Sequence, residues 1–145
     1  MIAVLGHYFL KNGGETGAVL QDIRSSKAVG EYLSPMGATM HTWKVGRAFA
    51  APKLREIKGI YGGELAGHYY FRDFFYSDSG IMDALIILDV VAQMKKEGVS
   101  LSQLIGRIEK YHNSGEINFR IEKKKEAMDK VRSHFLSIET PVANY

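Results

Sequence analysis

Apolar and polar residues along the chain follow two repeats, one of three to four residues and one of two residues. These repeats are typical of amphipathic helices and of half-buried strands, respectively. Helical spacing predicts helices over residues 2–10, 26–33, 49–57, 79–96 and 100–111. Short apolar or alternating runs predict strands over residues 18–23, 39–45 and 60–61, and an aromatic strand or hairpin over residues 68–76. Helices that alternate with strands favour the α/β class, as a three-layer α/β/α domain with a mainly parallel sheet.

Residues with a known preference for helix ends support these boundaries. Ser100 and Gln103 have the spacing of a capping box. Asp78 precedes the longest predicted helix, so we expect its carboxylate to accept hydrogen bonds from the free amides there. Pro52 falls in the first turn of the helix predicted over residues 49–57, where a missing N–H is tolerated.

A domain boundary is predicted near residues 112–115, where polar residues and glycine follow the last helix. We therefore expect an α/β domain over residues 1–112, and over residues 113–145 a linker with a partial β-α segment of a C-terminal α+β domain. Alternation over residues 116–121 predicts a half-buried strand, and residues 124–136 carry an apolar face at helical spacing. One strand and one helix bury too little surface to fold alone. This segment is expected to pack on the main domain or on a second copy, as a homodimer formed through residues 113–145.

Composition narrows the class of protein. The 145 residues are 46% hydrophobic and 24% charged, as in a globular domain, and the absence of cysteine excludes disulfides and thiol chemistry. A net charge of +3 suits an anionic small ligand, but the basic residues are not concentrated as nucleic acid would require. The apolar run over residues 81–91 contains two aspartates and is too short to cross a bilayer. We expect a cytoplasmic protein that binds neither nucleic acid nor membrane.

The loop over residues 62–68, which reads Gly-Gly-Glu-Leu-Ala-Gly-His, carries the clearest candidate chemistry. Gly63 and Gly67 would let the backbone approach a ligand closely, while Glu64 and His68 can bind neighbouring hydroxyls. In the alternative interpretation, Glu64 caps backbone N–H groups and His68 lies satisfied in the aromatic strand that follows. The residue types therefore indicate a small polar ligand, with a purely structural role left open.

Two further candidates lie just after predicted strands, at the edge where open α/β sheets bind ligands. Arg24 follows the strand over residues 18–23, and its guanidinium suits phosphate oxygens, although a surface arginine flanking a helix fits as well. Gly46 would allow close backbone approach beside Arg47. Because a guanidinium does not give up its proton, Arg47 either binds phosphate or leaves proton transfer to other groups.

Four motifs occur in order, at residues 22–26 (Asp-Ile-Arg-Ser-Ser), 43–47 (Trp-Lys-Val-Gly-Arg), 62–70 and 76–80 (Tyr-Ser-Asp-Ser-Gly). Together they resemble the alpha-D-phosphohexomutases, in particular the phosphomannomutase/phosphoglucomutase branch. The resemblance implies an isomerase that moves phosphate between the 1- and 6-positions of a hexose. Glucose or mannose 1-phosphate and 6-phosphate are the implied ligands, and glucosamine or N-acetylglucosamine phosphates are the alternative within the family.

The resemblance also implies roles for individual residues. Glu64 and His68 would bind sugar hydroxyls, with His68 also able to transfer a proton, and Arg24 would face the phosphosugar. This sequence departs from the usual family pattern at Ala66, where serine is common, and at Arg47, where histidine is common. Loss of the serine hydroxyl removes one hydrogen bond, worth about 0.5–1.5 kcal/mol, and does not abolish the loop.

The family mechanism needs three elements that this sequence lacks, namely a phosphorylated serine, an Asp-x-Asp-x-Asp loop for Mg²⁺ and a C-terminal phosphate clamp. No Asp-x-Asp pair occurs. We therefore expect the chain to be part of a longer mutase, to bind no metal or cofactor itself and to be inactive alone, whereas the full-length enzyme would use Mg²⁺. A protein-interaction module, using the aromatic residues 69–71 and the basic tail, is the alternative from another class.

Overall fold

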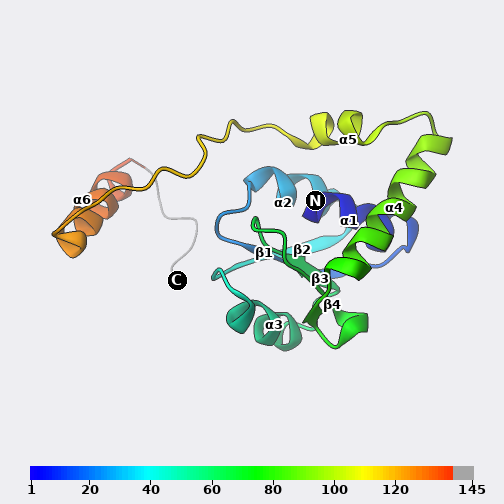
Figure 1. The fold of residues 1–145 in the computed structure, drawn as a ribbon, viewed down its shortest axis with the longest axis horizontal. Coiled ribbons are helices and arrows are strands. Elements are labelled where there is room, and N and C mark those ends of the chain that lie inside the picture. Colours follow the sequence, from blue (N-terminus) through cyan, green and yellow to red (C-terminus); the bar gives the residue numbers. More distant parts are fainter. Residues whose placement is uncertain (139–145) are drawn as a thin grey trace. The chain divides into compact units, whose positions relative to one another are not determined.

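The first part of the chain is built around a mixed sheet (Figure 1). The computed structural model describes residues 1–138, and the chain divides into two compact units, Met1–Tyr111 and His112–Tyr145. In the first unit the strand order is β2-β1-β3-β4-β5. The strands are β1 (Gly17–Asp22), β2 (Ala38–Trp43), β3 (Tyr61–Gly63), β4 (Tyr69–Phe71) and β5 (Ser77–Asp78). β1 pairs in parallel with β2 and β3, whereas β4 and β5 add antiparallel strands.

Helices connect the strands and confirm most of the elements expected from the repeats. They are α1 (Ile2–Gly6), α2 (Lys27–Leu33), α3 (Arg47–Glu56), α4 (Gly80–Lys96), α5 (Leu101–Ile108) and α6 (Lys124–Leu136). A π-helical segment, His7–Asn12, continues α1, and short 3-10 turns follow α2 and β4. No helix among residues 1–138 has both the length and the apolar character needed to span a membrane.

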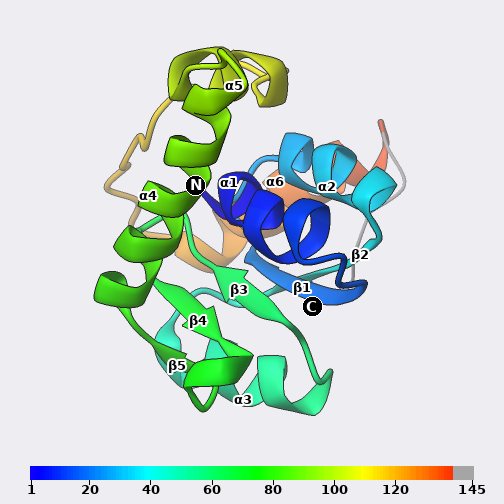
Figure 2. The ribbon, with the colours of Figure 1, turned by 90° about the vertical axis from the view of Figure 1, so that its right-hand side faces the viewer.

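The helices cover both faces of the sheet, which confirms the three-layer α/β/α architecture (Figure 2). On one face α1, α2 and α4 pack over Val19 and Phe71. On the other face α3 packs Leu54 against Leu20 and Tyr70. Neighbouring strand residues enter different cores because successive side chains of a strand point to opposite faces. Complete burial of each such side chain contributes about 1.5–3 kcal/mol to stability.

Local chemistry explains where two of the helices begin. Ser100 and Gln103 form both hydrogen bonds of the predicted capping box at the start of α5. α3 begins at Arg47, earlier than expected, because Gly46 has a φ of 118° and turns the chain into the helix soon after β2. Pro52 consequently lies inside α3, and its predicted place in the first turn is wrong.

The second unit contains α6 but not the strand predicted before it. Residues 116–121 form no strand and are exposed, so the prediction of a half-buried strand there is wrong. An alternating pattern gives a strand one apolar face, but its backbone N–H and C=O groups also need a neighbouring strand to pair with. The described part of this unit offers no such strand. The apolar face of α6, with Met128, Val131 and Phe135, is exposed. Residues 139–145 of the predicted C-terminal segment lie outside the described residues.

Candidate functional site

The carboxyl ends of β1, β2 and β3 bring the candidate residues of three loops to one edge of the sheet. Arg24 follows β1, Gly46 and Arg47 follow β2, and the loop with Glu64 and His68 follows β3. Parallel strands end at the same edge, which is the usual ligand-binding edge of open α/β sheets. The loops after β2 and β3 are joined directly, since the Gly46 N–H donates to the Glu64 carboxylate.

Glu64 is the centre of this junction. Its side chain is buried, with the residue only 3% exposed. Oε2 accepts a hydrogen bond from the Gly46 N–H at 3.1 Å, and Oε1 accepts one from the Tyr70 hydroxyl at 2.7 Å. The carboxylate therefore fastens the loop after β2 and the side chain of a β4 residue to its own loop. This arrangement agrees with the structural interpretation of Glu64, in which the carboxylate accepts hydrogen bonds from the protein itself. Each carboxylate oxygen has the capacity to accept one further hydrogen bond.

Tyr70 was not a site candidate in the sequence, because an aromatic residue in an apolar strand is typical of a core. Its ring is indeed buried beside α3, but its hydroxyl reaches Glu64. Burial and the hydrogen bond to the Glu64 carboxylate raise the pKa of Tyr70, while the positive charge of Arg47 lowers it by a smaller amount. The hydroxyl thus remains a proton donor at neutral pH, and Arg47 lies near enough to influence it.

The loop itself is a tight connection between β3 and β4. The Gly67 N–H donates to the Glu64 carbonyl at 3.0 Å, and the Glu64 N–H donates to the His68 carbonyl at 2.9 Å. Gly67 has a φ of 88°, a conformation that side chains rarely adopt. Gly67 is therefore required by the turn, and the turn places Leu65 and Ala66 in solvent.

His68 is half-exposed and is held by Asp78. The His68 Nδ1 lies 2.7 Å from Asp78 Oδ2, and Asp78 Oδ1 accepts the Tyr69 N–H at 3.1 Å. The carboxylate favours the proton on Nδ1, which leaves Nε2 free to meet a ligand. Asp78 is not the N-cap of α4, contrary to the sequence prediction. Ser79 takes that role by accepting the Met82 N–H, since Asp78 belongs to β5 and turns toward the β3–β4 hairpin.

Arg24 is held by Asp22, a residue of the motif at 22–26 to which the sequence analysis assigns no role. Its Nε donates to Asp22 Oδ2 at 3.2 Å, and the Ser25 hydroxyl donates to Asp22 Oδ1 at 2.5 Å. Asp22 is almost fully buried, whereas the Arg24 side chain is 40% exposed. The buried carboxylate fixes one end of the guanidinium, so its outer nitrogens remain available at the sheet edge.

Gly63 lies in the buried strand β3 and is packed on both sides. A Cβ at this position would lie 2.6 Å from Ile2 Cγ1 and 2.9 Å from Tyr69 Cδ1. The sequence associated this glycine with close approach of the backbone to a ligand. The structure supplies a sufficient reason of another kind, because α1 and β4 leave no room for a side chain.

Gly63→Ala is therefore expected to lower the free energy of unfolding by about 1–2 kcal/mol, because the added methyl group forces Ile2 and Tyr69 apart. Urea unfolding followed by circular dichroism measures the change. Gly80→Ala is the matched control, since its Cβ would meet no atom within 4 Å. The control should be neutral or slightly stabilising. Equal stability of Gly63→Ala and the wild type would contradict the packing explanation.

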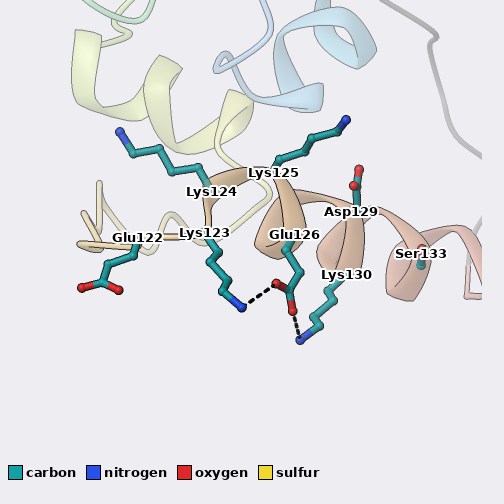
Figure 3. A pocket seen from close by; sticks show the side chains of 8 residues that line it. All are labelled: Glu122, Lys123, Lys124, Lys125, Glu126, Asp129, Lys130 and Ser133. Carbon is teal, nitrogen blue, oxygen red and sulfur yellow. Dashed lines mark ion pairs between the residues drawn. The ribbon is translucent and has the colours of Figure 1, made fainter.

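The charged surface of α6 carries exposed ion pairs. Figure 3 shows its side chains projecting from the helix, with Glu126 between Lys123 and Lys130. The Glu126 carboxylate lies 3.6 Å from the Lys123 amine and 3.2 Å from the Lys130 amine. All three side chains are largely exposed, and such pairs contribute about 0–1 kcal/mol. The pattern is that of a solvated helix face.

The described residues do not fit a metal centre. Over residues 1–138, no group of three or more histidine, aspartate or glutamate side chains converges as metal ligands. At the sheet edge, Asp22, Glu64 and Asp78 are each engaged by donors of the chain itself.

Comparison with known proteins finds relatives of this sheet and its loops. A sequence model described as phosphoglucomutase/phosphomannomutase, alpha/beta/alpha domain III, matches residues 1–111. A protein named "Phosphohexose mutases" from Xanthomonas campestris pv. campestris (strain B100) is 38% identical over 120 residues, which are 82% of this chain and 26% of that protein. A phosphomannomutase from Escherichia coli (strain K12) is 34% identical over 137 residues, which are 93% of this chain and 29% of that protein.

The fold also resembles that of a solved structure from this family. A solved structure of a phosphoglucomutase/phosphomannomutase family protein from Burkholderia thailandensis superposes with a TM-score of 0.73 at 20% identity. The match covers 91% of this chain and 27% of the other. The chain thus spans between a quarter and a third of the length of the relatives it matches.

Proposed function

The chain belongs to the phosphoglucomutase/phosphomannomutase family, with residues 1–111 matching its alpha/beta/alpha domain III, and we propose that these residues form the sugar-recognition domain of a mutase that interconverts hexose 1-phosphate and hexose 6-phosphate. The observation that carries the proposal is the set of donors and acceptors at one sheet edge, contributed by the loops after β1, β2 and β3. This edge carries hydrogen-bond donors, the guanidinium and imidazole groups, beside an acceptor, the carboxylate. Such a combination suits a ligand that carries both phosphate and hydroxyls.

In this proposal the two arginines recognise phosphate. Arg24 is held at one nitrogen by Asp22, so its remaining N–H groups can donate to phosphate oxygens without losing that anchor. Arg47 begins α3, where the free amides of the first turn also favour an anion. Their positions on different loops allow either end of a hexose phosphate to be held.

The loop after β3 would recognise the sugar hydroxyls. The Nε2 of His68 can accept the proton of a sugar hydroxyl that receives a phosphoryl group. In the reverse direction, the protonated ring can return that proton to the sugar oxygen from which the phosphoryl group departs. The two oxygens of Glu64 each keep one acceptor position, which suits two adjacent hydroxyls in either orientation of the sugar. Phosphoryl transfer itself is assigned to groups outside this domain, so we expect no turnover by the chain alone.

A two-dimensional NMR titration of the chain with mannose 1-phosphate and glucose 1-phosphate tests this function. We expect millimolar or tighter binding, with shifts confined to Arg24, Gly46, Arg47 and residues 63–68. Inorganic phosphate should shift only the arginines, and free mannose should shift only the loop, which separates the two halves of the site. Glucosamine 6-phosphate in the same series tests the alternative substrate. No shift at these residues with any hexose phosphate at 10 mM would overturn the proposed function.

A further inference from the structure

The proposed function assigns no role to the Tyr70 hydroxyl, although this hydroxyl contacts Glu64. We propose that Tyr70 is a positioning residue, which fixes the Glu64 carboxylate against the Gly46 amide and thereby sets the shape of the sugar-recognition loop. The inference rests on the proposed function for its consequence on binding. The contacts that define it do not depend on a ligand.

The geometry involves three different elements. Tyr70 lies on β4, Glu64 follows β3, and Gly46 lies between β2 and α3. The Tyr70 hydroxyl donates to one carboxylate oxygen at 2.7 Å, and the Gly46 N–H donates to the other at 3.1 Å. The two donors therefore hold the carboxylate at both ends. A carboxylate held in this way has one orientation, and so do its remaining lone pairs.

The tyrosine is rigid enough to impose that orientation. It is fully buried, and its ring packs with Leu20, Ala50 and Leu54 between the sheet and α3. A packed ring leaves the hydroxyl no alternative position, and a buried hydroxyl needs a partner. Tyr69 on the same strand points to the opposite core and forms no side-chain hydrogen bond among the described residues.

The burial of the Glu64 carboxylate also indicates that Tyr70 positions it. The residue is 3% exposed, and in the described part of the chain its carboxylate forms no ion pair. A buried carboxylate is costly unless donors satisfy it, and a hydrogen bond to a charged group stabilises more than a neutral one. Tyr70 and Gly46 thus take the place that a basic side chain has in an ion pair. Without the hydroxyl, Glu64 would be drawn toward solvent and the loop would lose its link to α3.

The experiment compares Tyr70→Phe with Tyr69→Phe, since each variant removes one hydroxyl from a buried ring of the same strand. Phenylalanine fills the same space, so both variants should fold. We expect Tyr70→Phe to bind mannose 1-phosphate about tenfold more weakly and Tyr69→Phe to bind within about twofold of the wild type. Hydrogen exchange at the Gly46 amide should accelerate about tenfold in Tyr70→Phe, while exchange at Leu20 in the core should not.

A double-mutant cycle with Glu64→Gln separates positioning from a general structural effect. If Tyr70 acts through Glu64, the loss of affinity caused by Tyr70→Phe should shrink to less than about threefold in the Glu64→Gln background. The same loss in both backgrounds would overturn the inference, and so would wild-type affinity of Tyr70→Phe. If the wild type binds no hexose phosphate, the proposed function fails and Gly46 exchange alone decides. Unchanged exchange in Tyr70→Phe then overturns the positioning role, and faster exchange supports it.

Discussion

Replacement of Glu64 with alanine is expected to abolish hexose phosphate binding and to lower the free energy of unfolding by about 3 kcal/mol. The variant removes the acceptor of two buried donors, the Gly46 N–H and the Tyr70 hydroxyl. A buried donor without a partner costs about 1–3 kcal/mol, so two of them outweigh the gain from not burying a carboxylate. Urea unfolding measures the stability, and NMR titration with mannose 1-phosphate under folding conditions measures the binding.

Glu56→Ala is the matched control for this prediction. Glu56 lies at the end of α3, is largely exposed and pairs with Lys53 at 2.7 Å. The Lys53 side chain is only 17% exposed, but Glu56 itself stands in solvent, and a surface pair contributes about 0–1 kcal/mol. The control should therefore lose no more than about 1 kcal/mol and should bind normally. Full stability of Glu64→Ala would show that the two hydrogen bonds do not hold the loop. Reduced stability with normal binding would limit Glu64 to a structural role.

The sequence predicts those features of the fold that depend on neighbours along the chain. The helical repeat of residues 79–96 and the capping box of Ser100 and Gln103 need no distant partner, and the structure contains both. The order of strands and helices likewise indicates the α/β class, because the connections between parallel strands must cross the sheet. The predicted strand over residues 116–121 failed for the converse reason, since the pattern says nothing about an available partner strand.

The candidate site is predicted only in part for the same physical reason. The candidate glycines, arginines and histidine lie together at one sheet edge, as expected, because strand ends can be located from the repeat. The partners that fix these groups could not be located. Gly46 lies 18 residues from Glu64, and the aspartate that holds His68 lies 10 residues beyond it. Asp78 also matched an N-cap pattern that Ser79, its neighbour, satisfies instead.

Asp83→Asn is expected to stabilise the folded chain at pH 7 by about 2 kcal/mol and to have almost no effect at pH 4. Asp83 lies in the first turn of α4, is 8% exposed, and its Oδ1 has no hydrogen-bond partner in the described structure. Burial raises the pKa of Asp83 to about 6, a shift that the N-terminal amine opposes and Asp78 adds to. Each unit of pKa difference between folded and unfolded chains corresponds to about 1.4 kcal/mol.

The direction of the pH dependence follows from which state binds the proton. The folded chain keeps the Asp83 proton up to about pH 6, whereas the unfolded chain releases it near pH 4. Wild-type stability from this group is therefore lost as pH rises from about 4 to 6, and asparagine, which cannot ionise, removes that loss. The helix N-terminus favours a negative charge by about 0.3–1 kcal/mol, too little to reverse the sign.

Urea unfolding of both chains at pH 4, 5, 6 and 7 should show a difference in stability that widens over this range. Asp89→Asn, on the exposed side of the same helix, should show no such widening. A constant difference for Asp83→Asn would mean that the carboxyl ionises in the folded chain as it does in the unfolded one. In that event a hydrogen-bond donor must reach Asp83 Oδ1, and the pKa of Asp83 in the folded chain would not be raised.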